Sequence, residues 1–275
     1  MTLPCFDSIT QVPAALRGQA VLAASHSGAY VAKLALQLRL GGLIVSDAGV
    51  GREQAGIAGL EILEARGVAA AAVSVHSARI GDGRDCLDRG RISFANAQAR
   101  ALGVQPDMLA AGALALLSEH AREPTGDLGT CAENRSSEMV AGRPVVIVDS
   151  NALVGPQDQG AILVTGSHGG LLGSRAESAI KWPVAAAVYN DADVGIERTG
   201  VGRLAALDAE GIAAATVSAW SARIGDGRST LEDGYVTHVN SCAMRVGGDV
   251  GISCRELVAR LVAALAADQQ RKHRQ

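Results

Sequence analysis

Short apolar segments alternate with segments of helical spacing along most of the chain. The apolar segments are typical of buried strands, and they span 19–24, 42–45, 68–75, 161–165, 183–189 and 212–219. Helices are predicted over 29–39, 54–66, 92–102, 199–210 and 256–267. Strands that alternate with helices indicate an α/β fold, in which a mainly parallel sheet carries helices on both faces.

Polar motifs recur along the chain in the same order. Ser25-His26-Ser27-Gly28 returns 142 positions later as Ser167-His168-Gly169-Gly170. The octet Ser77-Ala78-Arg79-Ile80-Gly81-Asp82-Gly83-Arg84 returns unchanged 144 positions later, over 221–228. The octets and the ten residues before each are identical at 14 of 18 positions. Chance does not produce this agreement, so the chain contains one unit twice.

The repeat defines the domain organisation. We expect a first α/β repeat over 1–118, a polar surface linker over 119–144 and a second repeat over 145–275. The change of offset places two extra residues of the second copy between Gly170 and Tyr189. Two such units are expected to be related by pseudo-twofold symmetry, with a cleft between them.

The polar residues shared by both copies follow the predicted strands. Ligands bind beyond the carboxyl ends of the strands in open parallel sheets, so a site is expected there. The candidate catalytic residues are His26, His168, Asp47, Asp191, Ser77 and Ser221. The candidate substrate-binding residues are Gly28, Gly169, Gly170, Arg79, Arg223, Asp82, Asp226, Arg84 and Arg228.

Each residue type suits one task at such a site. Histidine titrates near neutral pH, so His26 or His168 would be the general base or acid. Asp47 or Asp191 would orient that ring by accepting its second proton. The first arginine of each octet would hold a carboxylate or phosphate, and its serine would be a nucleophile or a hydrogen-bonding group. Backbone amides of the Ser-His-Gly turns would bind an oxyanion.

A structural explanation also exists for part of this pattern. An aspartate after a strand caps the following helix, and Gly-Asp-Gly forms a tight turn in which arginine pairs with aspartate. This alternative applies to Asp82, Asp226, Arg84 and Arg228, and a structural role is also the alternative for His26 and His168.

Composition narrows the class of protein. A net charge of −3 and an aromatic content of 3% argue against nucleic-acid binding, which needs basic surfaces and stacking platforms. Five cysteines without a CxxC pair predict reduced thiols in a cytoplasmic protein. No apolar stretch is long enough to predict a membrane segment. We expect a cytoplasmic homo-oligomer with neither a nucleic-acid nor a membrane partner.

No cofactor is expected. Gly49-Val50-Gly51 lacks the third glycine of a dinucleotide-binding turn, the second copy has Asp193 in place of Gly49, and no P-loop motif occurs. A divalent metal held by the histidines and the repeated aspartates is the alternative.

Two known arrangements share features with the repeat. The His-Gly and Asp-Ala strand ends resemble those of caspase-like proteases, but Gly49 or Asp193 stands where the nucleophilic cysteine would be. Cyclic-amide ring-opening hydrolases also have internal repeats, but they rely on Ser–Lys pairs, and Lys33 and Lys181 are not repeat equivalents.

These features predict an enzyme that acts on a small anionic metabolite in the cleft between the repeats. Hydrolysis of an amide-type C–N bond of a small carboxylate is the leading expectation. A lyase or isomerase would use the same groups. A non-catalytic protein that binds a small anion is the alternative from a different class.

Overall fold

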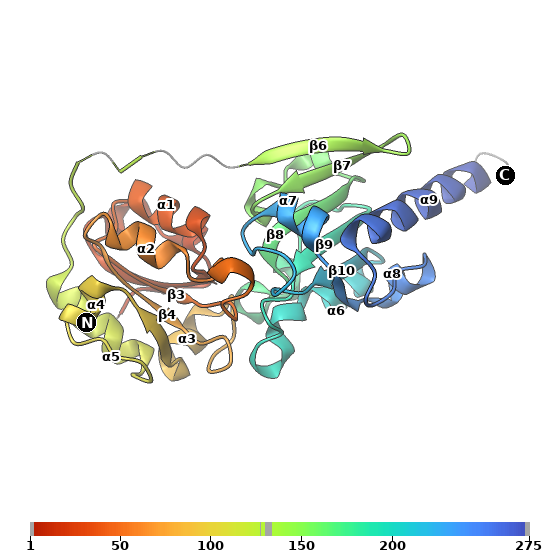
Figure 1. Ribbon diagram of the computed structural model, residues 1–275. Helices are drawn as coiled ribbons and strands as arrows, with labels where there is room; N and C mark the ends of the chain where they lie inside the picture. The colour runs from red at the N-terminus through yellow and green to blue at the C-terminus, as the bar shows by residue number, and fades with distance from the viewer. Residues whose placement is uncertain (1–2, 127, 130–133, 273–275) are drawn as a thin grey trace.

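A computed structural model describes residues 3–126, 128–129 and 134–272. The protein has an α/β fold with two mixed, mostly parallel sheets, one in each half of the chain (Figure 1). The first sheet has the strand order β1-β2-β3-β4-β5, and the second β11-β10-β9-β8-β7-β6. The predicted fold class and the six predicted strands are therefore confirmed.

The central strands of both sheets pair in parallel, and the antiparallel pairs are β4–β5, β6–β7 and β10–β11. The strands of the first sheet are β1 (Cys5–Phe6), β2 (Ala20–His26), β3 (Gly42–Ser46), β4 (Ala69–Val73) and β5 (Ile92–Ala95). Those of the second sheet are β6 (Arg135–Val140), β7 (Arg143–Val148), β8 (Ile162–His168), β9 (Ala186–Asn190), β10 (Ala213–Val217) and β11 (Val236–Val239).

Helices cover both faces of each sheet. In the first half they are α1 (Ala29–Gln37), α2 (Gly59–Glu64), α3 (Gly83–Arg89), α4 (Ala97–Ala101) and α5 (Ala110–His120). In the second half they are α6 (Arg203–Ala209), α7 (Gly227–Asp233), α8 (Ser241–Arg245) and α9 (Cys254–Lys272). Among the described helices, none is long and apolar enough to span a membrane.

The alternation of side chains along β2 shows how two cores form in one half. Leu22 packs with α3 and α5 on one face, whereas Val21 packs with α1 and α2 on the other. Figure 1 shows these helix pairs on opposite sides of the sheet. A strand buried on both faces needs apolar residues at every position, which explains the unbroken apolar segments.

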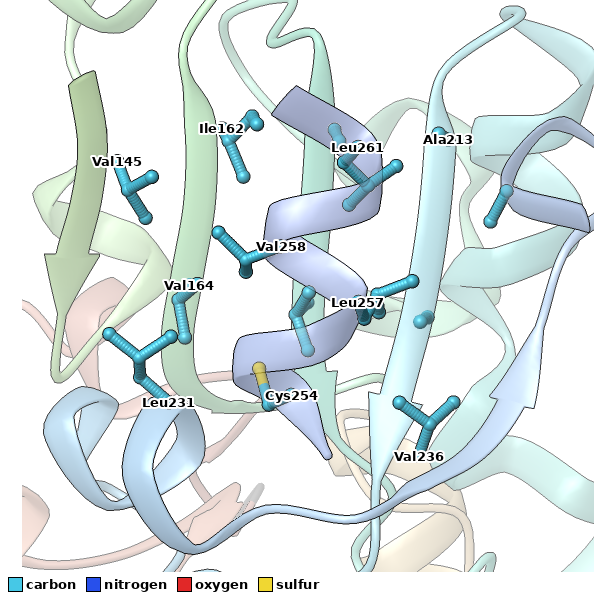
Figure 2. Packing of buried hydrophobic residues seen from close by; sticks show 14 of the residues in the cluster. Val145, Ile162, Val164, Ala213, Leu231, Val236, Cys254, Leu257, Val258 and Leu261 are labelled. Carbon is cyan, nitrogen blue, oxygen red and sulfur yellow. The ribbon is translucent and has the colours of Figure 1, made fainter. Parts of the chain in front are cut away.

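The second half is built in the same way, with the long helix α9 over one face of its sheet. Figure 2 shows Leu257, Val258 and Leu261 of α9 packed among strand residues that include Ile162 and Val164. Burial of apolar side chains of this size contributes about 1.5–3 kcal/mol each. The helix predicted over 256–267 is thus confirmed, and it begins at Cys254.

The helix predicted over 92–102 is wrong. The segment forms strand β5 and then helix α4. Asn96 separates them, because its side-chain oxygen accepts hydrogen bonds from the amides of Ala70 and Ala99 and its amide donates to Val68. Asn240 makes the equivalent contacts in the second half, so this repeated residue joins a strand to a helix end.

The segment predicted as a linker contributes to the second sheet. Its residues Arg135–Val140 form β6, which pairs with β7 over six residue pairs. Helix α5 ends at His120, just beyond the predicted end of the first repeat. Of the five cysteines, Cys131 lies outside the described residues, and the other four are free thiols.

Contacts between the halves are reciprocal. The amide of Arg52 donates to the carbonyl of Ala219 at 2.8 Å, and the amide of Ile196 donates to the carbonyl of Val75 at 2.9 Å. Arg52 and Ile196 are equivalent positions of the two copies, as are Val75 and Ala219, since each pair is 144 positions apart. A small apolar cluster of Ala48, Val75, Ile80, Ala192 and Ile224 joins the halves beside these bonds. Reciprocal contacts of this kind are what a twofold relation between two copies requires.

Candidate functional site

A cavity of about 410 Å³ lies between the two halves. Equivalent residues from both copies line it, notably the serine and histidine of each Ser-His-Gly turn. The structure therefore brings His26 and His168 together at one cavity, as the repeat predicts.

The two histidines are the last residues of β2 and β8. The amide N–H of Gly28 donates to Nδ1 of His26, and that of Gly170 donates to Nδ1 of His168, both at 3.1 Å. A ring nitrogen that accepts a hydrogen bond carries no proton, so the proton of the neutral ring is on Nε2. Each turn thus selects the same tautomer.

Each ring packs against the octet of the opposite half. A Cβ atom built on Gly225 would lie 2.9 Å from Cε1 of His26, and one on Gly81 would lie 3.3 Å from Cε1 of His168. Both glycines have φ near +80°, a conformation that glycine adopts without strain. A Cβ atom at either position would crowd the histidine ring, which explains why both octets have glycine there, Gly81 and Gly225.

Burial keeps both rings neutral. Only 6% of each histidine is exposed, and burial lowers the pKa of His26 to about 4. The pKa of His168 is well below its usual value, because of burial first and then because of the nearby Arg203 and His26. A neutral ring whose Nδ1 already accepts an N–H has no free lone pair, so this geometry does not support the predicted role of general base.

Arg203 is a charged residue of the cavity wall that the sequence analysis missed. It is 3% exposed, and its Nη1 donates to the carbonyls of Ser178 and Ala179. Its guanidinium lies 5.3 Å from the ring centre of Tyr189, and its Nε is buried without a hydrogen-bond partner. Burial lowers its pKa, and the phenol of Tyr189 offsets part of this effect; no carboxylate of the described residues is among the charges that act on it.

The first half has a glycine at the position of Arg203. The amide of Gly59 donates to the carbonyl of Ser27, as the amide of Arg203 does to that of Gly169, which establishes the equivalence. A Cβ atom on Gly59 would lie 2.8 Å from the carbonyl oxygen of Ser27 and 3.0 Å from the Cβ of Ala32 in α1. Helix α1 therefore leaves no room for a side chain there.

The second half has no counterpart of α1. Two short 3-10 helices, Leu172–Ser174 and Ala176–Ser178, follow its Ser-His-Gly turn instead. The space that α1 fills in the first half is thus open to the guanidinium of Arg203 in the second. The sequence carried one signal of this difference. The equivalent positions 59 and 203 hold glycine in the first copy and arginine in the second, which also has two extra residues between Gly170 and Tyr189.

The repeated aspartates hold backbone turns. Oδ1 of Asp47 accepts hydrogen bonds from the amides of Gly49 and Val75, and Oδ2 accepts one from the hydroxyl of Ser93. Asp191 accepts the equivalent bonds from the amides of Asp193 and Ala219, and burial raises its pKa. No hydrogen bond joins either carboxylate to the ring of His26 or His168, so the predicted orienting pair is not formed.

The octet serines also have local partners. The hydroxyl of Ser77 donates to the carbonyl of Ser74 and accepts from the amide of Arg91. Ser221 makes the equivalent bonds with Ser218 and Tyr235. Both serines fasten the octet loop to the chain that follows it, and neither lines the cavity.

The octet arginines join the halves. Arg79 pairs with Asp82, Asp85 and, across the interface, Glu197. Arg223 pairs with Asp226 of its own half and reciprocally with Glu53 of the first. Neither guanidinium lines the cavity of the histidines, although Arg223 lines a second cavity of about 310 Å³ between the halves. Because both already have carboxylate partners, the geometry does not favour them as the substrate clamp.

The remaining predicted binding residues are used within the fold. Asp82 and Asp226 are the N-caps of α3 and α7, as the structural alternative proposed. Arg84 pairs with Asp88 at 2.7 Å, and Arg228 with Glu138 at 2.8 Å, on the surface.

The turn amides are also occupied. Those of Gly28 and Gly170 donate to the histidine rings, and that of Gly169 donates to the carbonyl of Asn190 at 2.8 Å. The predicted oxyanion site therefore has no free donor in these amides. Within the described ranges, no three His, Cys, Asp or Glu side chains group as metal ligands would.

Comparison with known proteins found no match: no family model matches the chain, and neither a curated protein nor a solved structure is significantly similar to it. The fold and the cavity define the class of this protein as an α/β protein with two sheet-bearing units and a cavity between them that both histidines line.

Proposed function

We propose that the protein is an enzyme that acts on a small carboxylate-bearing metabolite in the cavity between its halves. The observation that carries this proposal is Arg203, a cation buried at the cavity wall without a carboxylate partner in the described chain. A buried charge is costly unless it is paired. A carboxylate of the ligand supplies that pair, and the planar guanidinium suits it.

The rest of the cavity supports an anion of small size. A volume of about 410 Å³ is in the range of small-molecule sites, roughly 300–1,000 Å³. Lys181 adds a second positive charge to the lining, and Glu177 is its one carboxylate in the described part of the chain. The anionic end of the ligand is therefore drawn toward the second half.

The reaction we propose is hydrolysis of an amide-type C–N bond of that metabolite. Arg203 would hold the carboxylate, and Glu177 would accept a proton from the attacking water in place of the histidines. A lyase or isomerase of a small carboxylate could use the same cation and base.

A panel of substrates tests the reaction. Linear and cyclic amides that carry a carboxylate, such as succinamate and 5-oxoproline, are incubated with the protein, and products are followed by mass spectrometry. Hydrolysis adds one water to the ring compound and releases ammonia from the linear amide. Loss of a C–N bond without uptake of water would favour the lyase instead.

A matched pair of variants tests the site. Arg203→Met should weaken binding of succinamate at least tenfold by calorimetry, because a charged hydrogen bond contributes about 1.5–3 kcal/mol. Arg84→Met removes an equal charge from the surface, where Arg84 pairs with Asp88, and should leave affinity unchanged. Equal affinities of wild type and Arg203→Met would contradict the proposal.

Non-catalytic binding of a small anion is the second candidate function. It is favoured by one observation, the absence of a free lone pair on either buried histidine. Tight binding of the panel compounds without any product, in wild type and in Glu177→Gln alike, would decide for it.

A further inference from the structure

The turns around both histidines restrict the rings to one protonation state. In the Nδ1–H tautomer and in the imidazolium, Nδ1 would point a hydrogen at the N–H of Gly28 or Gly170. Both halves keep this contact at 3.1 Å, although one is followed by a helix and the other by 3-10 turns. The arrangement therefore persists where the surroundings differ.

The other nitrogen of each ring has no partner. Nε2 of His26 and Nε2 of His168 form no hydrogen bond with any described residue, and both rings are more than nine-tenths buried. Neither Nε2 is among the described side-chain atoms that are both fully buried and unpartnered, so each N–H is accessible from the cavity. Both histidines line the cavity, one from each half, so a ligand there is within reach of both donors.

The charged groups around the cavity favour the same state. Arg203 and the opposite ring disfavour a proton on His168, and Lys181 is a further cation of the lining. Glu177 is the one described carboxylate of the lining and lies mostly in solvent. Among the residues that the structure describes, no buried carboxylate lines the cavity to stabilise an imidazolium.

From this geometry we infer that His26 and His168 are neutral Nε2–H donors to an oxygen-bearing group of the ligand. The inference rests on the proposed function and narrows its substrate class. The ligand carries a carboxylate for Arg203 and, apart from it, a carbonyl group for the imidazoles. Charge that develops on the carbonyl oxygen during attack meets donors that are already oriented, which is how preorganised N–H groups lower a barrier.

Two probes of similar shape test the substrate class. Succinamate has a carboxylate and an amide carbonyl, whereas pentanoate has the carboxylate alone. The wild-type protein should bind succinamate at least tenfold more tightly than pentanoate. Equal affinities would overturn the inference.

Two variants of one histidine test the donor role. His168→Gln keeps an N–H near the position of Nε2, whereas His168→Leu removes it, and both lose the contact with Gly170. The preference for succinamate should be largely retained in His168→Gln and lost in His168→Leu. If the ring were a base, both variants would lose turnover equally and the preference would not follow the donor.

Nitrogen-15 NMR of the histidine side chains in the ligand-free protein gives an independent readout. At pH 7 both buried rings should show the Nε2–H tautomer, and neither should titrate between pH 8 and 5.5. An imidazolium or an Nδ1–H signal overturns the donor role alone. Failure of both probes to bind the wild-type protein overturns the proposed function and the donor role with it.

Discussion

The ring of His26, at the end of β2, lies against Gly225 in the opposite half of the chain. A methyl group at Gly225 would approach Cε1 of His26 to 2.9 Å. The equivalent contact joins His168 and Gly81. Each histidine is thus oriented by its own turn and confined by the other half, so the cavity and the interface between the halves depend on one another.

Gly225→Ala should therefore be more harmful than the same change at Gly211. Both glycines have positive φ, but a Cβ atom on Gly211 meets nothing within 4 Å. Both variants should lose about 1–2 kcal/mol for the left-handed backbone, and Gly225→Ala about 1–3 kcal/mol more for overpacking. Urea unfolding and calorimetry measure the difference. Equal losses, with succinamate binding intact in both variants, would show that the space between residue 225 and His26 accommodates a methyl group.

Asp47 should behave as a structural acceptor. Asp47→Asn keeps an oxygen for the amides of Gly49 and Val75, whereas Asp47→Ala leaves both buried donors unpaired. We expect turnover of Asp47→Asn within a few fold of wild type, and a loss of about 1–3 kcal/mol in the free energy of unfolding for Asp47→Ala. A stable Asp47→Asn protein without turnover would restore the catalytic role to this carboxylate.

The ion pair of Arg223 and Glu53 should contribute little. Their side chains are 35% and 58% exposed, and exposed pairs contribute about 0.2–1 kcal/mol. A double-mutant cycle with Arg223→Met and Glu53→Gln should give a coupling energy in that range, which falls as salt is added. A coupling above 2 kcal/mol would mean that the pair is shielded from solvent in solution.

Removal of the buried charge should not destabilise the ligand-free fold. Replacement of a buried ion pair by apolar side chains of similar volume is often neutral or stabilising, by up to about 4 kcal/mol, and Arg203 has no carboxylate partner among the described residues that its removal would leave unpaired. Arg203→Met should therefore unfold at the same or a higher urea concentration than wild type. A marked loss of stability would show that the carbonyls of Ser178 and Ala179 alone offset the charge.

Stability should fall on mild acidification. Below about pH 6.5 the unfolded chain protonates His26, while the folded ring stays neutral until its pKa of about 4. The unfolded state then binds more protons, so the free energy of unfolding should fall by about 2 kcal/mol for this residue between pH 7.5 and 5. His168, whose pKa is also lowered, adds to the loss.

Histidine variants identify the source of this pH dependence. Urea unfolding of wild type, His26→Gln and His120→Gln at pH 7.5 and 5 compares a buried histidine with the exposed His120 of α5. Only His26→Gln should lose part of the pH dependence. The same slope in all three proteins would show that other groups cause it.

The pattern of apolar segments and the repeated motifs were sufficient to predict the fold class and six of the strands. Apolar segments identified six strands, and the recurrence of Ser-His-Gly placed His26 and His168 at strand ends that share one cavity. The sequence did not distinguish polar residues that serve a ligand from those that serve the backbone. Asp47 and Ser77 are repeated because amides of distant segments need acceptors, and those partners become visible only in three dimensions.

Arg203 shows the opposite limit. Identity between the two copies favours Arg79 and Arg223, which pair with carboxylates of both halves. A residue found in one copy alone carries no such signal, although here it supplies the cavity with its buried cation. Differences between the copies, such as Gly59 against Arg203, were the more informative comparison for the site.

In the second half, Arg203 takes the space that helix α1 fills in the first half. This difference has a consequence for the origin of the chain. Two identical subunits with the same reciprocal interface would carry every substitution twice, so a cavity on their axis would receive two buried guanidiniums or none. Fusion of the copies into one polypeptide removes that constraint, since each half then mutates alone. The one buried guanidinium of the described lining gives the cavity a polarity that no symmetric homodimer of this unit could have, and an asymmetric molecule can then be held in a single orientation.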